Sequence, residues 1–225
     1  MIEGDAANHI ARVLRLRPGD PLVLFDGRGG EYAARVEELR NDAVIVSVGE
    51  RSAADRESPL ELTLAQGVSR GERMDWVVQK ATELGVTRIV PVLTERTVVK
   101  LDARQSERRR SHWRGIAVAA CEQSARDRIP DIAAPVGLHD FLQGDGSAGT
   151  RLLLSPTGTT AVGDLPQPVG RVIVLIGPEG GLAEGEQRAA LAAGFEAVRL
   201  GPRVLRTETA AVAAVTLLQH RFGDL

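Results

Sequence analysis

The sequence predicts an α/β fold in two parts, a small β-rich region followed by a larger domain built on a parallel sheet. The first observation is a change of pattern at the polar stretch 50–59, after which strand-like and helix-like segments alternate. The second is that the runs at 151–156 and 171–177 are continuously apolar, as in strands buried on both faces. We therefore expect domains at 1–55 and 60–225.

The N-terminal region contains three runs typical of strands. They lie at 20–25, 31–39 and 41–49, and the last two are joined by a turn at Asn41 and Asp42. This pattern leaves little room for a helix and predicts a small barrel.

The second region alternates strands with helices that have apolar faces. Gly85 is placed to end the first helix, and the final helix is apolar on most sides, so it must be buried in the core or against a partner subunit. We expect strands at 60–68, 86–94, 151–156, 171–177 and 195–201, and helices at 70–85, 103–125, 182–194 and 205–220.

The composition excludes several classes of protein. A net charge of -2 gives no global signal for nucleic acid or membrane, so an RNA surface would have to be a local patch. The single cysteine, Cys121, excludes an internal disulfide and is expected to be a buried apolar residue. No signal peptide, no membrane span and no metal-ligand spacing is present, which predicts a cytoplasmic protein without a metal.

Three predicted strands end in loops marked by glycine or proline, at 152–158, 175–181 and 199–210. Ligands bind at the carboxyl ends of parallel strands, so these loops predict a pocket. The middle loop, LIGPEGG, does not match a phosphate site, because Pro178 lacks an N–H and Glu179 would repel an anion. It favours a ligand such as adenosine joined to a sulfonium, although a plain tight turn is an alternative interpretation.

The third loop leads into the final helix with two arginines, Arg203 and Arg206. Thr207 is expected to be the N-cap, and Glu208 lies in the first turn, where the helix dipole favours an anion. Capping explains both residues as well as a functional role does.

The helix expected at 103–125 begins with five arginines and one acidic residue, Glu107. As a group on a near-neutral protein they indicate a contact surface for RNA phosphates, and the alternative is a solvated helix face. Trp113 lies among them and is expected to be available for stacking on a base.

Five motifs, in order over nearly the whole chain, resemble the RsmE-type 16S ribosomal RNA uridine-N3 methyltransferases, a branch of the SPOUT superfamily. They are HIARVLRLRPGD, KATELGVTRIVPV, AACEQSARDRIPDI, LIGPEGG and RLGPRVLRTETA. The resemblance implies an N-terminal PUA-like β-barrel, a SPOUT-type parallel sheet with a deep trefoil knot, and a homodimer. It also implies methylation of N3 of one uridine in the small ribosomal subunit, with S-adenosylmethionine as cofactor.

The resemblance also implies roles for individual residues. Arg126 and Arg206 would act at the catalytic centre on the uracil carbonyl oxygens, with Glu208 as a conceivable base. The cofactor would be bound by Leu154, Ser155, Pro156, Ile176, Gly177, Pro178, Glu179, Gly180, Gly181, Leu200, Gly201, Val204, Leu205, Arg206, Thr209 and Ala210. RNA would be bound by Arg12, Arg15, Arg17, Arg104, Arg108, Arg109, Arg110, Arg114 and Arg128.

Two other functions remain open from the sequence. One is a different SPOUT reaction, ribose 2′-O-methylation, because the GPEGG loop occurs in that branch as well. The other is a non-catalytic RNA-binding module, in which the α/β domain serves only for dimerisation. The presence of all three loop motifs argues against the module.

Overall fold

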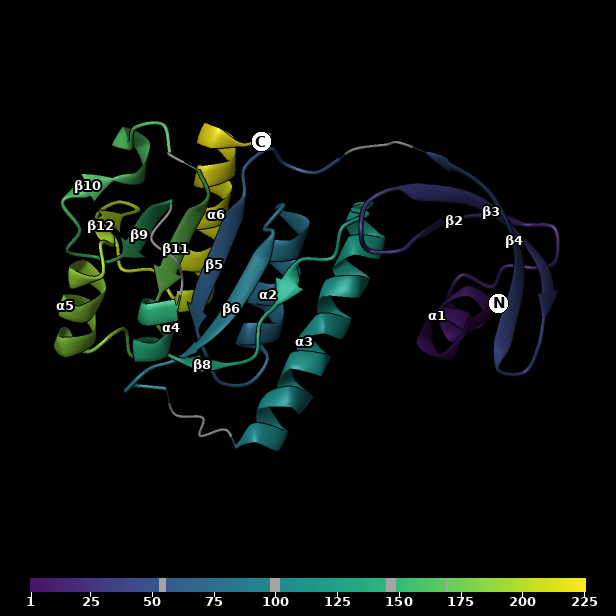
Figure 1. Ribbon diagram of the computed structural model, residues 1–225, viewed down its shortest axis with the longest axis horizontal. Coiled ribbons are helices and arrows are strands. Elements are labelled where there is room, and N and C mark those ends of the chain that lie inside the picture. Colours follow the sequence, from purple (N-terminus) through teal and green to yellow (C-terminus); the bar gives the residue numbers. More distant parts are fainter. Residues whose placement is uncertain (53–55, 98–101, 145–148, 169) are drawn as a thin grey trace. The chain divides into compact units, whose positions relative to one another are not determined.

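The computed structural model describes residues 1–52, 56–97, 102–144, 149–168 and 170–225 (Figure 1). The chain divides into two compact units, Met1–Arg56 and Glu57–Leu225. The first is an antiparallel β unit and the second is an α/β unit with a parallel sheet, so the predicted fold class is confirmed.

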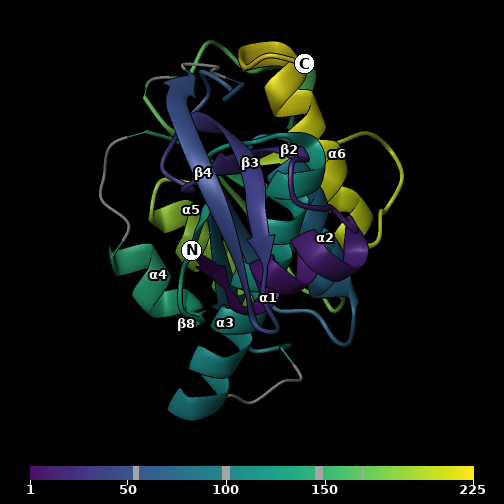
Figure 2. The same cartoon turned by 90° about the vertical axis from the view of Figure 1, so that its right-hand side faces the viewer.

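The first unit is a four-stranded antiparallel sheet in the order β1-β4-β3-β2. Figure 2 shows its longer strands, β2, β3 and β4. The three predicted strands are present, and the short β1 pairs with the start of β4. The strands are β1 (Ile2–Glu3), β2 (Pro21–Phe25), β3 (Glu31–Leu39) and β4 (Ala43–Ser52).

The expectation of little room for a helix is wrong, because the N-terminus forms α1 (Gly4–Asn8) followed by a π-helix, η1 (His9–Val13). These two short segments place Ala7 and Ile10 in one small core with Val36 and Val44 of the sheet. The helical segments therefore cover an apolar sheet face that would otherwise be exposed to water.

The second unit is built on a sheet in the order β10-β12-β9-β11-β5-β6-β7, with β8 also paired to β6. Every pairing between its strands is parallel. All five predicted strands occur, whereas the two-residue strands β7, β8 and β10 are too short to give a sequence period. The strands are β5 (Leu62–Gly67), β6 (Arg88–Leu93), β7 (Asp131–Ile132), β8 (Val136–Gly137), β9 (Thr150–Leu154), β10 (Thr160–Ala161), β11 (Val172–Ile176) and β12 (Glu196–Arg199).

Helices cover both faces of this sheet (Figure 1). Alternate residues of β11 show this directly: Val172 and Val174 pack in one core with α2, α3 and α6, and Ile173 and Leu175 in another with α4 and α5. Burial on both faces is why the strand sequences are continuously apolar. The helices are α2 (Arg73–Glu83), α3 (Ala103–Ser124), α4 (Leu138–Gly144), α5 (Glu184–Ala192) and α6 (Thr207–Phe222), with a 3-10 turn, η2 (Val162–Asp164).

The C-terminal end of α2 lies where Gly85 predicted it. Gly85 has φ +82° directly after the C-cap of α2, a conformation that glycine adopts without steric cost. Of the helices in the described part of the chain, none combines the length and apolar character needed to cross a bilayer.

Candidate active site

A pocket of about 530 Å³ opens at the carboxyl ends of β9, β11 and β12. The three predicted loops form it, and of the predicted cofactor residues only Thr209 does not line it. Thr209 lies one position before the buried Ala210 and is exposed on the outer side of α6.

The walls of the pocket are mainly apolar side chains and glycine backbone. Such a lining with a few convergent polar groups is typical of a small-molecule site. The apolar contributors include Leu153, Leu154, Ile176, Leu182, Leu200 and Leu205.

The GPEGG turn is held close to the neighbouring strand β5. A Cβ atom on Gly67, the last residue of β5, would lie 2.4 Å from the backbone nitrogen of Pro178, so only glycine fits there. The turn closes on itself, since the N–H of Gly181 donates to the carbonyl of Pro178 at 2.8 Å, and Gly181 has φ +68°. Loop shape is therefore fixed by backbone contacts.

Glu179 anchors this turn to the loop between β5 and α2. Its Oε1 accepts a hydrogen bond from the N–H of Arg70 at 3.0 Å and from Nη1 of Arg73 at 2.6 Å. Burial raises the pKa of Glu179, but the N–H of Arg70 and the guanidinium of Arg73 together lower it below its ordinary value. The carboxylate thus stays ionised and shapes the loop.

A second arginine, Arg96, fixes the same turn from another direction. It follows β6, and its Nη1 donates to the carbonyl of Gly180 at 2.7 Å. Arg73 and Arg96 both line the pocket, and the sequence prediction missed both. Their place in the sequence could have identified them, because each arginine follows a parallel strand that ends at the same edge of the sheet as the predicted loops.

The sequence predicted Thr207 as the N-cap of α6, and this prediction is wrong. Arg206 occupies that position, without a side-chain cap. The Thr207 Oγ1 instead donates to the carbonyl of Gly177 at 2.6 Å and accepts from Nε2 of the fully buried Gln66 at 2.9 Å. One hydroxyl therefore joins the start of α6 to the GPEGG turn and to the end of β5.

Replacing Thr207 by valine should destabilise the protein by about 1–3 kcal/mol, because the partly buried carbonyl of Gly177 and the buried Nε2 of Gln66 each lose a hydrogen bond. Thr207→Ser is the matched control and should be close to wild type, since it keeps the hydroxyl. Both tryptophans, Trp76 and Trp113, belong to the second unit, so their fluorescence during urea unfolding measures the difference. Equal midpoints for the two variants would contradict the bridging role.

Glu208 has one carboxylate oxygen near Arg73 and one without a partner. The distance from Oε1 to Nε of Arg73 is 3.9 Å, and Oε2 is buried with no hydrogen bond to the described residues. A buried carboxylate oxygen normally has a hydrogen-bond partner, so Oε2 lacks a contact that such an atom usually makes, and Glu208 itself lines the pocket. Arg206 lines the same pocket, and the structure therefore brings these two predicted catalytic residues together.

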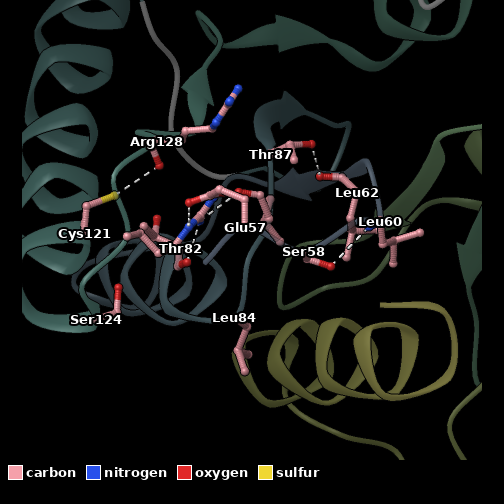
Figure 3. Close-up of polar contacts among 12 residues, drawn as sticks. Glu57, Ser58, Leu60, Leu62, Thr82, Leu84, Thr87, Cys121, Ser124 and Arg128 are labelled. Carbon is pink, nitrogen blue, oxygen red and sulfur yellow. Dashed lines mark hydrogen bonds and ion pairs between the residues drawn. The ribbon is translucent and has the colours of Figure 1, made fainter. Parts of the chain in front are cut away.

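The structure does not bring Arg126 to this pocket. Its side chain is 5% exposed. Nε and Nη2 donate to the carboxylate of Glu57, and Nη1 donates to the carbonyls of Thr82 at 2.6 Å and Val86 at 3.1 Å. Figure 3 shows Glu57 beside Thr82, near the end of α2. These contacts favour a structural role for Arg126.

Cys121 is buried on α3, and its Sγ lies 3.5 Å from the carbonyl oxygen of Arg128 (Figure 3). Burial raises the pKa of the Cys121 thiol to about 11, which keeps it protonated at neutral pH. The interpretation of Cys121 as a buried apolar residue is confirmed.

The arginines predicted to bind RNA differ in how free their side chains are. Arg110 donates to the carbonyl of Ile132 at 2.9 Å and lies 3.7 Å from Glu107, so its guanidinium is already engaged. Arg109 is partly buried. The exposed members are Arg12, Arg15 and Arg17 in the first unit and Arg104, Arg108, Arg114 and Arg128 in the second.

Trp113 is not available for stacking, contrary to the sequence prediction. It is 1% exposed, belongs to the main core, and donates from Nε1 to Oδ1 of Asp75 at 3.1 Å. The prediction followed the neighbouring arginines and overlooked the helical spacing of Trp113 with the other buried residues of α3, which are Ala117, Ala120 and Cys121.

Comparison with known proteins gives matches over both units. Residues 56–219 match a family model described as an RNA methyltransferase domain, and residues 2–49 match an RNA methyltransferase PUA domain. Ribosomal RNA small subunit methyltransferase E from Buchnera aphidicola subsp. Schizaphis graminum is 34% identical, over 97% of this chain and 89% of the relative. The Bacillus subtilis protein of that name is 31% identical, over 98% and 89%.

Solved structures of similar proteins also match almost the whole chain. Ribosomal RNA small subunit methyltransferase E from Neisseria gonorrhoeae, bound to S-adenosyl methionine, is 39% identical with a TM-score of 0.93, covering 100% of this chain and 92% of that one. A Legionella pneumophila protein in complex with the bound cofactor SAM is 41% identical with a TM-score of 0.94, covering 98% and 91%. Relatives of one kind thus span almost the whole chain, which belongs to the ribosomal RNA small subunit methyltransferase E family of RNA methyltransferases.

Proposed function

We propose that this enzyme transfers a methyl group from S-adenosylmethionine to N3 of a uridine in the 16S ribosomal RNA of the small subunit. The observation that carries the proposal is the pocket: loops from three strands, predicted to bind this cofactor, meet around one cavity. Similar chains at 39% and 41% identity hold the same cofactor in their solved structures, which supports the assignment.

The residues of the pocket fit S-adenosylmethionine. Apolar walls suit an adenine ring, and the backbone groups of the glycine loops suit its polar edge. Pro178 and the anionic Glu179 do not form a phosphate cradle, which fits a cofactor without phosphate. When bound, the cofactor supplies a methyl group on a sulfonium.

The chain's own residues would then prepare the uridine. The base must be unpaired and turned out of its stack to enter the pocket. Glu208, which lines the pocket, accepts the N3 proton on its carboxylate, and Arg206 donates to a uracil carbonyl oxygen and stabilises the negative charge that develops. The N3–C bond forms as the S–C bond breaks, and the pocket aligns the two reacting atoms.

Arg126 has a structural role in this proposal, because its donors are used within the second unit. The exposed arginines of the predicted RNA set would contact the phosphate backbone. Residues 1–55 and 60–225 would act as a PUA-like RNA-binding domain and a SPOUT methyltransferase domain, and the matched family ranges support this division.

We extend the proposal to a cytoplasmic homodimer in which each α/β domain contains a trefoil knot. The resemblance to the family supports this extension, and Trp76 on α2 and Leu217 on α6 are exposed apolar side chains that a partner could cover.

The test is methylation of purified small subunits and of naked 16S ribosomal RNA with labelled S-adenosylmethionine, followed by mass spectrometry of the nucleosides. The expected product is N3-methyluridine. Label at a ribose 2′-oxygen would favour the other SPOUT reaction, and no cofactor binding by calorimetry at millimolar concentration would favour the non-catalytic module. Family membership favours an enzyme over that module.

A further inference from the structure

The segment between β12 and α6, residues 201–206, forms one edge of the pocket mouth and is called the lip here. Leu205 lies within the lip and Leu200 just before it, and both pack against the core that contains α2, α3 and α6. Pro202 has a fixed φ, and together with the packing of these two leucines it limits the conformational freedom of the lip. A preorganised segment loses little entropy when it binds a partner.

The lip exposes an apolar side chain at the mouth. Val204 is 79% exposed, the highest value among the large apolar side chains of the described residues. Val204 also lines the pocket, so this residue lies where the cavity meets the solvent. A ligand wholly enclosed by the pocket would leave much of Val204 in water, whereas a larger substrate that crosses the mouth would cover it.

Four arginines line the pocket, but they differ in how their donors are used. Arg73 binds Glu179, and Arg96 binds the carbonyl of Gly180. In the described parts of the chain, Arg203 and Arg206 have no ion pair and no side-chain hydrogen bond, and both are exposed. The proposed reaction uses Arg206 at the base, which leaves Arg203 on the lip without an assigned role.

We propose that the lip binds the RNA at the pocket mouth. Arg203 binds a phosphodiester next to the target nucleotide, and Val204 packs against that nucleotide. This inference rests on the proposed function. A base that enters the pocket leaves its flanking phosphates at the mouth, since the backbone is too large and too charged to follow. The planar fork of an arginine matches two phosphate oxygens.

The test compares Arg203→Ala and Arg203→Lys with Arg188→Ala, an exposed arginine on α5 that does not line the pocket. Binding of 16S ribosomal RNA is measured over a range of salt concentrations. Arg203→Ala should weaken RNA binding by about tenfold. It should also reduce the salt slope, which is the slope of the logarithm of the binding constant against the logarithm of the salt concentration, by about one unit. Arg203→Lys should retain the slope, because it keeps the charge, and Arg188→Ala should match wild type. Val204→Ser should raise the KM for RNA without changing the slope.

Calorimetry with S-adenosylmethionine separates this role from cofactor binding. Cofactor affinity within twofold of wild type supports the lip as an RNA contact. Weaker cofactor binding with an unchanged RNA salt slope would assign Arg203 to the cofactor carboxylate and overturn the inference, as would normal RNA binding by Arg203→Ala. Failure of the wild-type protein to methylate RNA would count against the proposed function instead, because the binding measurement does not depend on turnover.

Discussion

Replacing Glu208 by glutamine is expected to lower kcat for methyl transfer by about 10²- to 10⁴-fold, the usual contribution of a positioned proton acceptor. Glutamine has nearly the same shape but cannot take up the N3 proton. The buried Oε2 of Glu208 has no partner among the described residues, so the change breaks no hydrogen bond to that oxygen. Single-turnover kinetics with saturating cofactor and RNA measure the chemical step.

The matched control is Glu179→Gln, which alters the other carboxylate of the pocket. Its Oε1 is held by Arg70 and Arg73, so the loss of charge should loosen the GPEGG turn. We expect a higher KM for the cofactor with kcat within a few-fold of wild type. A Glu208→Gln variant that keeps kcat within threefold would exclude Glu208 as the proton acceptor.

The long elements of the α/β unit were predictable because each is long enough to show its period. Strand β11 is apolar on both faces, and the structure shows separate cores on its two sides. The pocket was predictable for a related reason: parallel strands place their carboxyl ends at one edge, so glycine- and proline-marked loops that follow them must meet. The short helical segments α1 and η1 carry no comparable signal.

The polar contacts that fix the site were not predictable. Thr207 fits the local rule for an N-cap, yet its partners lie 30 and 141 residues away in sequence, at Gly177 and Gln66. Capping rules consider only neighbouring residues, and the tertiary contact is decided by how β5, β11 and α6 pack. Trp113 is different, because its helical spacing with Ala117 and Cys121 was visible in the sequence and indicated burial.

Replacing Arg126 by leucine is expected to destabilise the second unit by about 3–5 kcal/mol, because it removes a buried guanidinium that pairs with the largely buried carboxylate of Glu57. It also removes the donor to the carbonyls of Thr82 and Val86 near the end of α2. Tryptophan fluorescence during urea unfolding measures the loss. The double variant with Glu57→Leu should recover part of it, since replacing both members of a buried pair with apolar groups is often neutral.

Arg128→Ala is the matched control for Arg126, because it removes an exposed arginine two positions away, and it should change stability by less than about 0.5 kcal/mol. The same variants separate a structural role from a catalytic one. If Arg126 only joins Glu57 to the end of α2, the folded fraction of Arg126→Leu should bind cofactor normally and methylate RNA at close to the wild-type rate. Normal stability combined with a hundredfold loss of kcat would instead place Arg126 in the reaction. Because its guanidinium is buried and engaged within the second unit, we expect the first result.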